Sequence, residues 1–206
     1  MVFQPIFTSI RIFFLTLLFS IPLACVITIF RVRRILILSS VIRAFIVVIR
    51  GTPLILQLLF FYFGPPAILH MSIDRFTSVI VAFSINYAAY FAEIFRSGYI
   101  SLPRGQFEAC KILGLSKTFS FFHVYVPQIV KRITPAFSGE VVTLVKDTAL
   151  ASALGIAELF TFAQKRTQAE VSIMPVAWAG VFYFAFNCVV AFVFWMIEKR
   201  FDRYKI

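Results

Sequence analysis

Two long apolar runs without a charged residue, 12–30 and 176–197, constrain this chain more than any other feature of its sequence. Each is close to the length of about 20 residues that an α-helix needs to cross a bilayer. Of all 206 residues, 61% are apolar and only 14% are charged, whereas a soluble domain carries about 25% charged residues. We therefore expect an all-α integral membrane protein, and the composition excludes a disordered tail and a nucleic-acid-binding arm.

Three further stretches have spanning length but are interrupted by breakers or polar groups. They are 51–70 with Gly51, Pro53, Pro65 and Pro66, 76–95 with Asn86 and Glu93, and 133–155 with Glu140, Lys146 and Asp147. Because Pro53 disfavours a helical conformation at Thr52, the first stretch is expected to be kinked or broken, although an ordinary helix start with proline in its first turn fits equally well. Together the five stretches predict five spans in one domain that covers residues 1–206.

The basic residues predict the orientation of these spans. The formal net charge is +11, and most of the lysines and arginines lie in the connections 31–50 and 96–132 and in the tail. The positive-inside rule then places the N-terminus outside and the C-terminus in the cytoplasm. An odd number of spans leads to the same orientation. The apolar part of the first connection, 35–49, fits either an interfacial segment or an inward extension of the second span.

The longest polar segment, 97–132, contains a short helix with clear boundaries. Pro103 precedes it and Gly114 follows it, which predicts a helix over 104–113. Phe107 and Cys110, followed by Leu113, recur at helical spacing and predict one apolar stripe. Two alternatives remain on these residues alone: a helix that docks against a partner, or an interfacial helix that lies on lipid headgroups.

Several motifs in order resemble those of bacterial ABC-importer permeases of the polar amino acid (histidine/glutamine/arginine) type. The stretch 105–114 is similar to their EAA loop, although Cys110 stands where alanine is usual. Two further departures lie outside this stretch: Ile129 follows Pro127-Gln128 where alanine is common, and Ala149 replaces a common serine. The other matching stretches are 50–54, Gln57, 62–64, 90–98, 127–128, 146–150 and 155–159. The resemblance covers nearly the whole chain and implies a permease of the bacterial cytoplasmic (inner) membrane.

The resemblance implies a division of labour between this chain and several partners. The chain would form the translocation pathway for an amino acid, a second permease copy or a sister permease would complete it, and a binding protein would deliver the substrate. A separate ATPase would bind ATP and magnesium; the chain has no Gly-x-x-x-x-Gly-Lys-Ser/Thr loop and is expected to bind no cofactor itself. The residues implied to dock the ATPase are Gly105, Glu108, Ala109 and Gly114.

Polar residues inside the spans are candidates for the pathway, because charges are costly in lipid and usually face protein or water. Lys146, Asp147 and Thr148 are three polar groups in succession, which predicts a cavity or a broken helix there. The resemblance places this segment near the pathway, with Glu158 as a further candidate. Asn86 fits either substrate contact or a hydrogen bond between helices. Glu93 is expected to pair with Arg96 three residues along the same helix.

The alternative function is an ion-coupled secondary transporter or a small channel that works without an ATPase. Such transporters are built from inverted repeats with matching broken helices, and we find no such symmetry in the sequence. The chain shows no catalytic cluster, and its two histidines, His70 and His123, are far apart and are assigned to no metal site. The motifs are shared by permeases for basic, acidic and neutral polar amino acids, and by homodimers and heterodimers alike.

Overall fold

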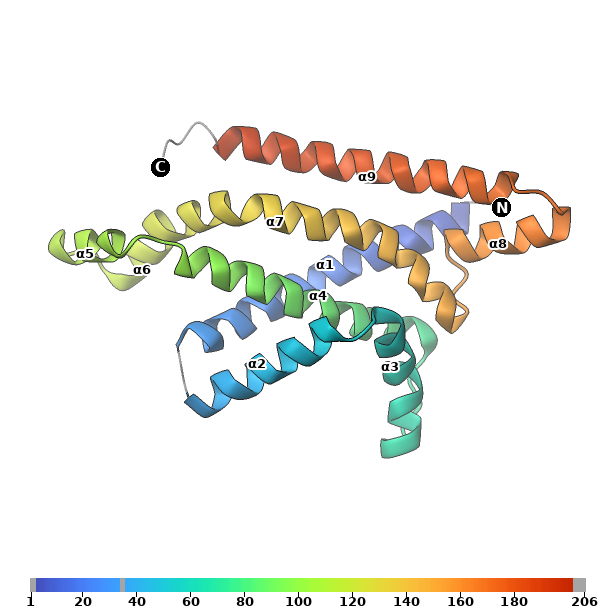
Figure 1. Cartoon of the computed structure of the whole chain (residues 1–206), viewed down its shortest axis with the longest axis horizontal. Coiled ribbons are helices and arrows are strands. Elements are labelled where there is room, and N and C mark those ends of the chain that lie inside the picture. The colour runs from blue at the N-terminus through green and yellow to red at the C-terminus, as the bar shows by residue number, and fades with distance from the viewer. Residues whose placement is uncertain (1–2, 34–35, 202–206) are drawn as a thin grey trace.

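Three long helices dominate the computed structural model, which describes residues 3–33 and 36–201 (Figure 1). They are α1 (Phe3–Val32), α4 (Arg75–Ile100) and α9 (Met174–Phe201), and all three are long and apolar enough to cross a membrane. They contain the stretches 12–30, 76–95 and 176–197, so these three predicted spans are helical and remain candidate spans. The described residues form only helices, turns and short connections.

The predicted break in the second span is also confirmed. Helices α2 (Leu36–Gly51) and α3 (Leu54–Leu69) meet at an angle of 111° around Thr52 and Pro53. Proline at the start of α3 lacks an N–H to continue the ladder of α2. If this bent pair is one span, the number of candidate spans rises to four.

The predicted fourth span, 133–155, is a helix that changes type. Helix α7 (Val126–Asp147) ends at Asp147, and the 3₁₀ helix η2 (Thr148–Leu154) follows it. Its charged residues keep α7 out of the helices that qualify as spans by length and apolarity. A polar helix that the sequence analysis did not predict, α8 (Leu159–Glu170), then leads to α9.

Helix α4 forms the centre of the bundle. In the most apolar 18-residue stretch of α4, 67% of the residues are buried, compared with 6% in that of α9. Helix α9 therefore lies at the periphery, with its large apolar side chains exposed. The residues Ala82, Ala88 and Ala92 on α4 are fully or almost fully buried, because small side chains allow helices in a membrane to approach closely. The long helices α1 and α7 pack against α4, and this brings the candidate residues of α4 and α7 together.

The two ends of the bundle consist of different helices. A short helix, α5 (Arg104–Ile112), extends beyond the ends of α4 and α7 at one end of the molecule, together with α6 (Lys117–Phe119) (Figure 1). The end of α1 and the start of α2 lie toward the same end, whereas the start of α1 and α8 lie at the other. The π-helix η1 (Ser120–Tyr125) joins α6 to α7.

Candidate translocation pathway and coupling surface

A helix is present where the sequence predicts one, at α5, and its boundaries have the expected residues. Pro103 precedes its first turn, and Gly114, with φ of +65°, lies just past its end. In this left-handed conformation glycine is favoured, because a Cβ atom would crowd the next carbonyl. The helix therefore ends where the sequence predicts.

One face of α5 is held firmly against the bundle. Phe107 lies between two tyrosine rings, 5.9 Å from that of Tyr99 on α4 and 4.6 Å from that of Tyr125 in η1. Cys110 is 5% exposed, and the Gln128 side chain of α7 donates a hydrogen bond to Gln106 at 3.2 Å. These contacts connect α5 to both α4 and α7.

The predicted apolar stripe is only partly right. Phe107 and Cys110 face the protein, but Leu113 is 71% exposed. The reason is that the helix ends at Ile112, so Leu113 no longer continues the helical spacing.

The opposite face of α5 has no covering element among the described residues. Gly105, Glu108, Ala109 and Ile112 recur at helical spacing and are all exposed. A Cβ atom added at Gly105 or at Gly114 would meet nothing within 4 Å. The sequence-predicted docking residues therefore share one open surface, which we call the α5 outer face: Gly105, Glu108, Ala109, Ile112 and the adjoining Gly114.

Inside the bundle, the predicted residue Asp147 pairs with Tyr87. The phenol of Tyr87 donates a hydrogen bond of 2.7 Å to Oδ2 of Asp147, which is the last residue of α7. Tyr87 is 2% exposed and Asp147 is half-buried. Lys146, one residue earlier, is exposed, so a cation and an anion lie at the change from α-helix to 3₁₀ helix.

The other three predicted pathway residues are buried and hydrogen-bonded within the protein. The Thr148 hydroxyl donates to the carbonyl of Val145 at 2.8 Å, and the Asn86 amide donates to the side chain of Gln57 at 3.0 Å. Glu158 is fully buried and caps α8, where its carboxylate accepts from the backbone N–H groups of Phe160 and Thr161. These three side chains are therefore buried, whereas Lys146 is exposed and Asp147 is half-buried.

Glu158 has two further donors besides the helix terminus. Its carboxylate accepts the Thr161 hydroxyl at 2.8 Å and the Tyr183 hydroxyl of α9 at 3.0 Å. Anionic caps are favourable at a helix N-terminus, where free N–H groups and the helix dipole both attract negative charge. This arrangement joins the start of α8 to α9.

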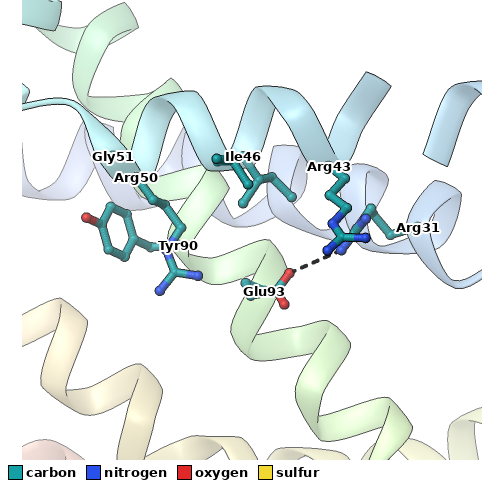
Figure 2. A pocket seen from close by; sticks show the side chains of 8 residues that line it. Arg31, Arg43, Ile46, Arg50, Gly51, Tyr90 and Glu93 are labelled. Atoms are coloured by element: carbon teal, nitrogen blue, oxygen red, sulfur yellow. Dashed lines mark ion pairs between the residues drawn. The ribbon is translucent and has the colours of Figure 1, made fainter. Parts of the chain in front are cut away.

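Two adjoining cavities lie on the α5 side of the Tyr87–Asp147 pair. The larger, of about 510 Å³, lies between α2, α4 and α7 and includes Arg50, Tyr90, Glu93 and Glu140. The smaller, of about 360 Å³, shares the first three of these residues and extends toward Arg31 and Arg43 (Figure 2). Both are within the size range of small-molecule sites.

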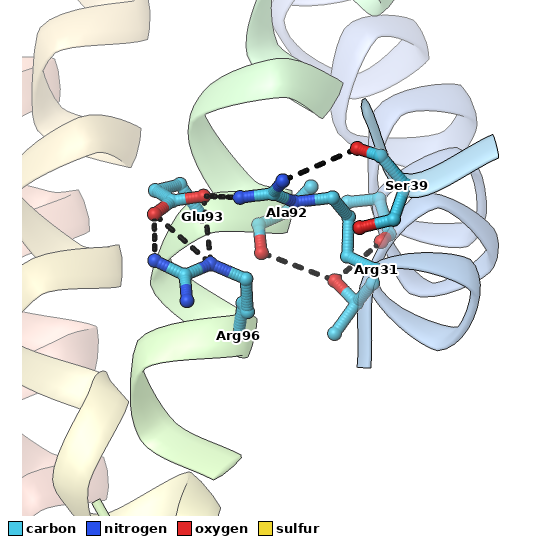
Figure 3. Close-up of polar contacts among 7 residues, drawn as sticks. Arg31, Ser39, Ala92, Glu93 and Arg96 are labelled. Atoms are coloured by element: carbon cyan, nitrogen blue, oxygen red, sulfur yellow. Dashed lines mark hydrogen bonds and ion pairs between the residues drawn. The ribbon is translucent and has the colours of Figure 1, made fainter. Parts of the chain in front are cut away.

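Glu93 is the acidic centre of this region. The expected pair with Arg96 is present, with Nε of Arg96 lying 3.0 Å from both carboxylate oxygens. A second arginine, Arg31 of α1, approaches the same carboxylate at 3.7 Å (Figure 3). Glu93 therefore pairs with one arginine of its own helix and with one of α1, and the sequence analysis did not anticipate this second contact.

The sequence analysis did not include Arg50, Tyr90 and Gln57 among the site residues. The guanidinium of Arg50 lies 4.9 Å from the ring centroid of Tyr90, a cation–π geometry. A signal for Tyr90 was available, since Tyr87, Tyr90 and Glu93 recur every three residues and so share one face of α4. No such signal was available for Arg50, because it lies in α2, 40 residues before Tyr90.

Gln57 holds the bend between α2 and α3. Its amide nitrogen lies 2.7 Å from the carbonyl oxygen of Ile49 and 2.8 Å from the hydroxyl of Thr52, while its own oxygen accepts from Asn86 of α4. The end of α2 thereby gains partners for carbonyl groups that the break leaves free. The bent pair and α4 are consequently joined by one buried polar network.

A helical bundle with long apolar spans, a buried polar pair inside and an uncovered helix face at one end has the architecture of a membrane transport subunit. Residues 20–203 match the family described as "Binding-protein-dependent transport system inner membrane component". The chain belongs to this family. Membership makes it a non-catalytic permease of the inner membrane, with the ATPase on a separate subunit, and implies a binding protein as a further partner.

Individual relatives agree with this membership. The chain is 33% identical over 202 residues to "L-cystine transport system permease protein TcyB" of Bacillus subtilis (strain 168), which covers 97% of this chain and 86% of the relative. It is 35% identical over 165 residues to "Glutamine transport system permease protein GlnP" of Escherichia coli (strain K12), covering 79% and 75% of the two chains.

A solved structure has the same fold over nearly the full length. It is described as "Crystal structure of an amino acid ABC transporter with histidines", and it superposes with a TM-score of 0.87 at 29% identity, covering 97% of this chain and 93% of that chain. An inward-facing structure of the MetNI methionine ABC transporter shares the fold at a TM-score of 0.74 and 17% identity.

Proposed function

We propose that this chain forms the translocation pathway of an ATP-driven amino acid importer and couples to its ATPase through α5. The observation that carries this proposal is the asymmetry of α5, whose outer face is open while its inner face is fixed to α4 and α7. The relatives described as cystine and glutamine permeases support an amino acid as the substrate. We propose five spans, with the N-terminus outside and the C-terminus in the cytoplasm.

The α5 outer face is suited to insertion into a groove of the ATPase. Gly105 and Ala109 allow a partner to approach the backbone closely, and Glu108 is free to pair with a basic group on that partner. ATP-driven movement of the ATPase would displace α5, and Phe107 would pass this displacement to Tyr99 and Tyr125. The helices α4 and α7 would then switch between two packed arrangements, as a two-state element requires.

The pathway is proposed to run between α4 and α7, past the Tyr87–Asp147 pair and through the larger of the two cavities. Lys146 and Asp147 offer a cation and an anion, which complement the two charges of a zwitterionic amino acid. Thr148, Asn86 and Glu158 would support this segment from within the protein, because their polar groups are already paired there. ATP and magnesium would bind to the ATPase, and this chain would bind no cofactor.

A second permease, either another copy or a sister chain, is proposed to close the open side of the pathway. The larger cavity lies between α2, α4 and α7 and is not fully enclosed by the described residues. A binding protein on the outer surface would deliver the amino acid to the paired permeases. These partners complete the arrangement that the family membership implies.

Uptake assays test this function directly. The complete complex would be reconstituted in liposomes with the binding protein, and ATP-dependent uptake of radiolabelled amino acids would be measured. Asp147→Asn and Lys146→Gln are expected to lower uptake strongly, whereas Asp147→Glu and Lys146→Arg should retain part of it because they keep the charge. Equal uptake by charge-removing and charge-preserving variants would exclude the assigned pathway, and uptake without any ATPase would exclude the coupled mechanism.

A further inference from the structure

We propose that the cavity between α1, α2 and α4 binds the phosphate group of an anionic phospholipid from the cytoplasmic leaflet. This inference rests on the proposed orientation of the permease, in which that end of the bundle faces the cytoplasm. The cavity of about 360 Å³ is lined by Arg31, Arg43 and Arg50 and by a single carboxylate, that of Glu93 (Figure 2). Guanidinium groups bind phosphate oxygens through paired, charge-assisted hydrogen bonds.

The positive charge in this cavity exceeds the negative charge that the protein supplies. Glu93 is shared by Arg31 and Arg96. Arg50 stacks on Tyr90 where this cavity adjoins the larger one, and the larger cavity also contains Glu140. Arg43 has no hydrogen bond or ion pair to another described residue. A bound anion would compensate these neighbouring cations.

Arg31 carries a second sign of a missing acceptor. Its side chain is 13% exposed, and its Nε–H is buried without a hydrogen-bond partner in the described part of the chain. Its other nitrogens reach Glu93 and the carbonyl oxygen of Ser39 (Figure 3). Buried polar groups are nearly always hydrogen-bonded in folded proteins, so this N–H group points to a ligand that supplies an oxygen atom.

The surface of α2 favours a lipid over a free anion as the source of the phosphate. Val47 lines the cavity and is 64% exposed, so the cavity opens at an apolar edge of the helix. From this edge the exposed surface of α2 continues into a stripe of apolar residues, Ile37, Val41, Phe45 and Val48. Such amphipathic helices lie at the membrane interface, with acyl chains on the apolar side and anionic headgroups near the arginines.

Native mass spectrometry of the complete permease–ATPase complex tests this site. The complex would be titrated with short-chain phosphatidylglycerol and, separately, with phosphatidylcholine of the same chain length. We expect the wild type to retain phosphatidylglycerol at a lower lipid concentration, and Arg43→Gln to weaken this retention by about tenfold, the effect of losing one charge-assisted hydrogen bond. Arg43→Lys should keep most of the preference because the charge remains.

Arg33→Gln is the matched control, since Arg33 is exposed at the same end of α1 and does not line the cavity. It should leave lipid retention unchanged. Equal retention of both lipids, or equal loss in the Arg33 and Arg43 variants, would overturn the proposal. Displacement of phosphatidylglycerol by millimolar inorganic phosphate would assign the site to a free anion instead. Lipid retention is measured without transport, so a failure of the importer function would appear separately, in uptake and in ATPase binding.

Discussion

The phenol oxygen of Tyr87 lies 2.7 Å from Oδ2 of Asp147, and this hydrogen bond joins the middle of α4 to the last residue of α7. It is the direct polar link between a buried aromatic residue and the charged segment at the end of α7. Beyond Asp147 the chain changes to a 3₁₀ helix. The orientation of the Asp147 carboxylate in the proposed pathway therefore depends on a donor from another helix.

Tyr87→Phe is expected to lower the rate of amino acid uptake by about tenfold, because a hydrogen bond to a charged group contributes roughly 1.5–3 kcal/mol. The ring and its packing against Phe83 and Phe91 would remain. Initial uptake rates and KM in reconstituted liposomes measure the effect. Tyr183→Phe is the control, since it removes a hydroxyl that binds Glu158 instead; an equal effect of both variants on KM would show that the Tyr87 hydroxyl has no special role.

Gln57→Leu is expected to destabilise the bend between α2 and α3 by roughly 2–4 kcal/mol. The substitution leaves the carbonyl group of Ile49 and the amide of Asn86 without their partners, and each unpaired buried group costs about 1–3 kcal/mol. Equilibrium unfolding in mixed micelles measures the loss. The double variant with Asn86→Leu should be destabilised by less than the sum of the two single variants, since both share one network. Strict additivity would contradict a shared network.

Glu158→Ala is expected to act on stability rather than on substrate affinity. Four donor groups converge on this carboxylate, two of them backbone N–H groups at the start of α8. Loss of the cap and of the buried hydrogen bonds should cost at least about 2 kcal/mol, seen as a lower apparent Tm. The KM for uptake should stay unchanged in the folded fraction. A raised KM with unchanged Tm would instead make Glu158 a pathway residue.

The spans that contact lipid most are the ones that the sequence predicts best. Residues 12–30 and 176–197 are apolar on every side because lipid tolerates little else, and they lie within α1 and α9. The break at Pro53 follows from the covalent structure of proline. Helix α8 escaped prediction because it is polar and depends on Glu158 and on Tyr183, a residue of the next helix.

The candidate site was predicted in part, from the charged residues that interrupt apolar stretches. Asp147 stands out because a charge in an apolar stretch needs a partner. Its partner Tyr87 lies 60 residues away along the chain, and only the packing of α4 against α7 selects that residue among the tyrosines. Local spacing likewise predicts the pair of Glu93 with Arg96, but not the contact with Arg31 of α1.

The α5 outer face contains two glycines, and their substitutions should have different consequences. Gly105 lies in the first turn of α5 with open space around it, so Gly105→Leu should fold normally and block only the close approach of the ATPase. Gly114 has φ of +65°, and a residue with a Cβ atom there costs roughly 1–2 kcal/mol in backbone strain. Gly114→Val should therefore disturb the end of α5 itself.

Co-purification of the ATPase with each variant, together with the apparent Tm of the permease alone, separates the two effects. Gly105→Leu should lose the ATPase at unchanged Tm, and Gly105→Ala should retain more of it because the added side chain is smaller. Gly114→Val should lower both quantities. Glu108→Lys, which reverses a charge on the same exposed face, should behave like Gly105→Leu. Both Gly105 and Glu108 are exposed, and a Cβ atom at Gly105 meets nothing within 4 Å. Retention of the ATPase by both Gly105→Leu and Glu108→Lys would therefore mean that α5 is not the docking helix.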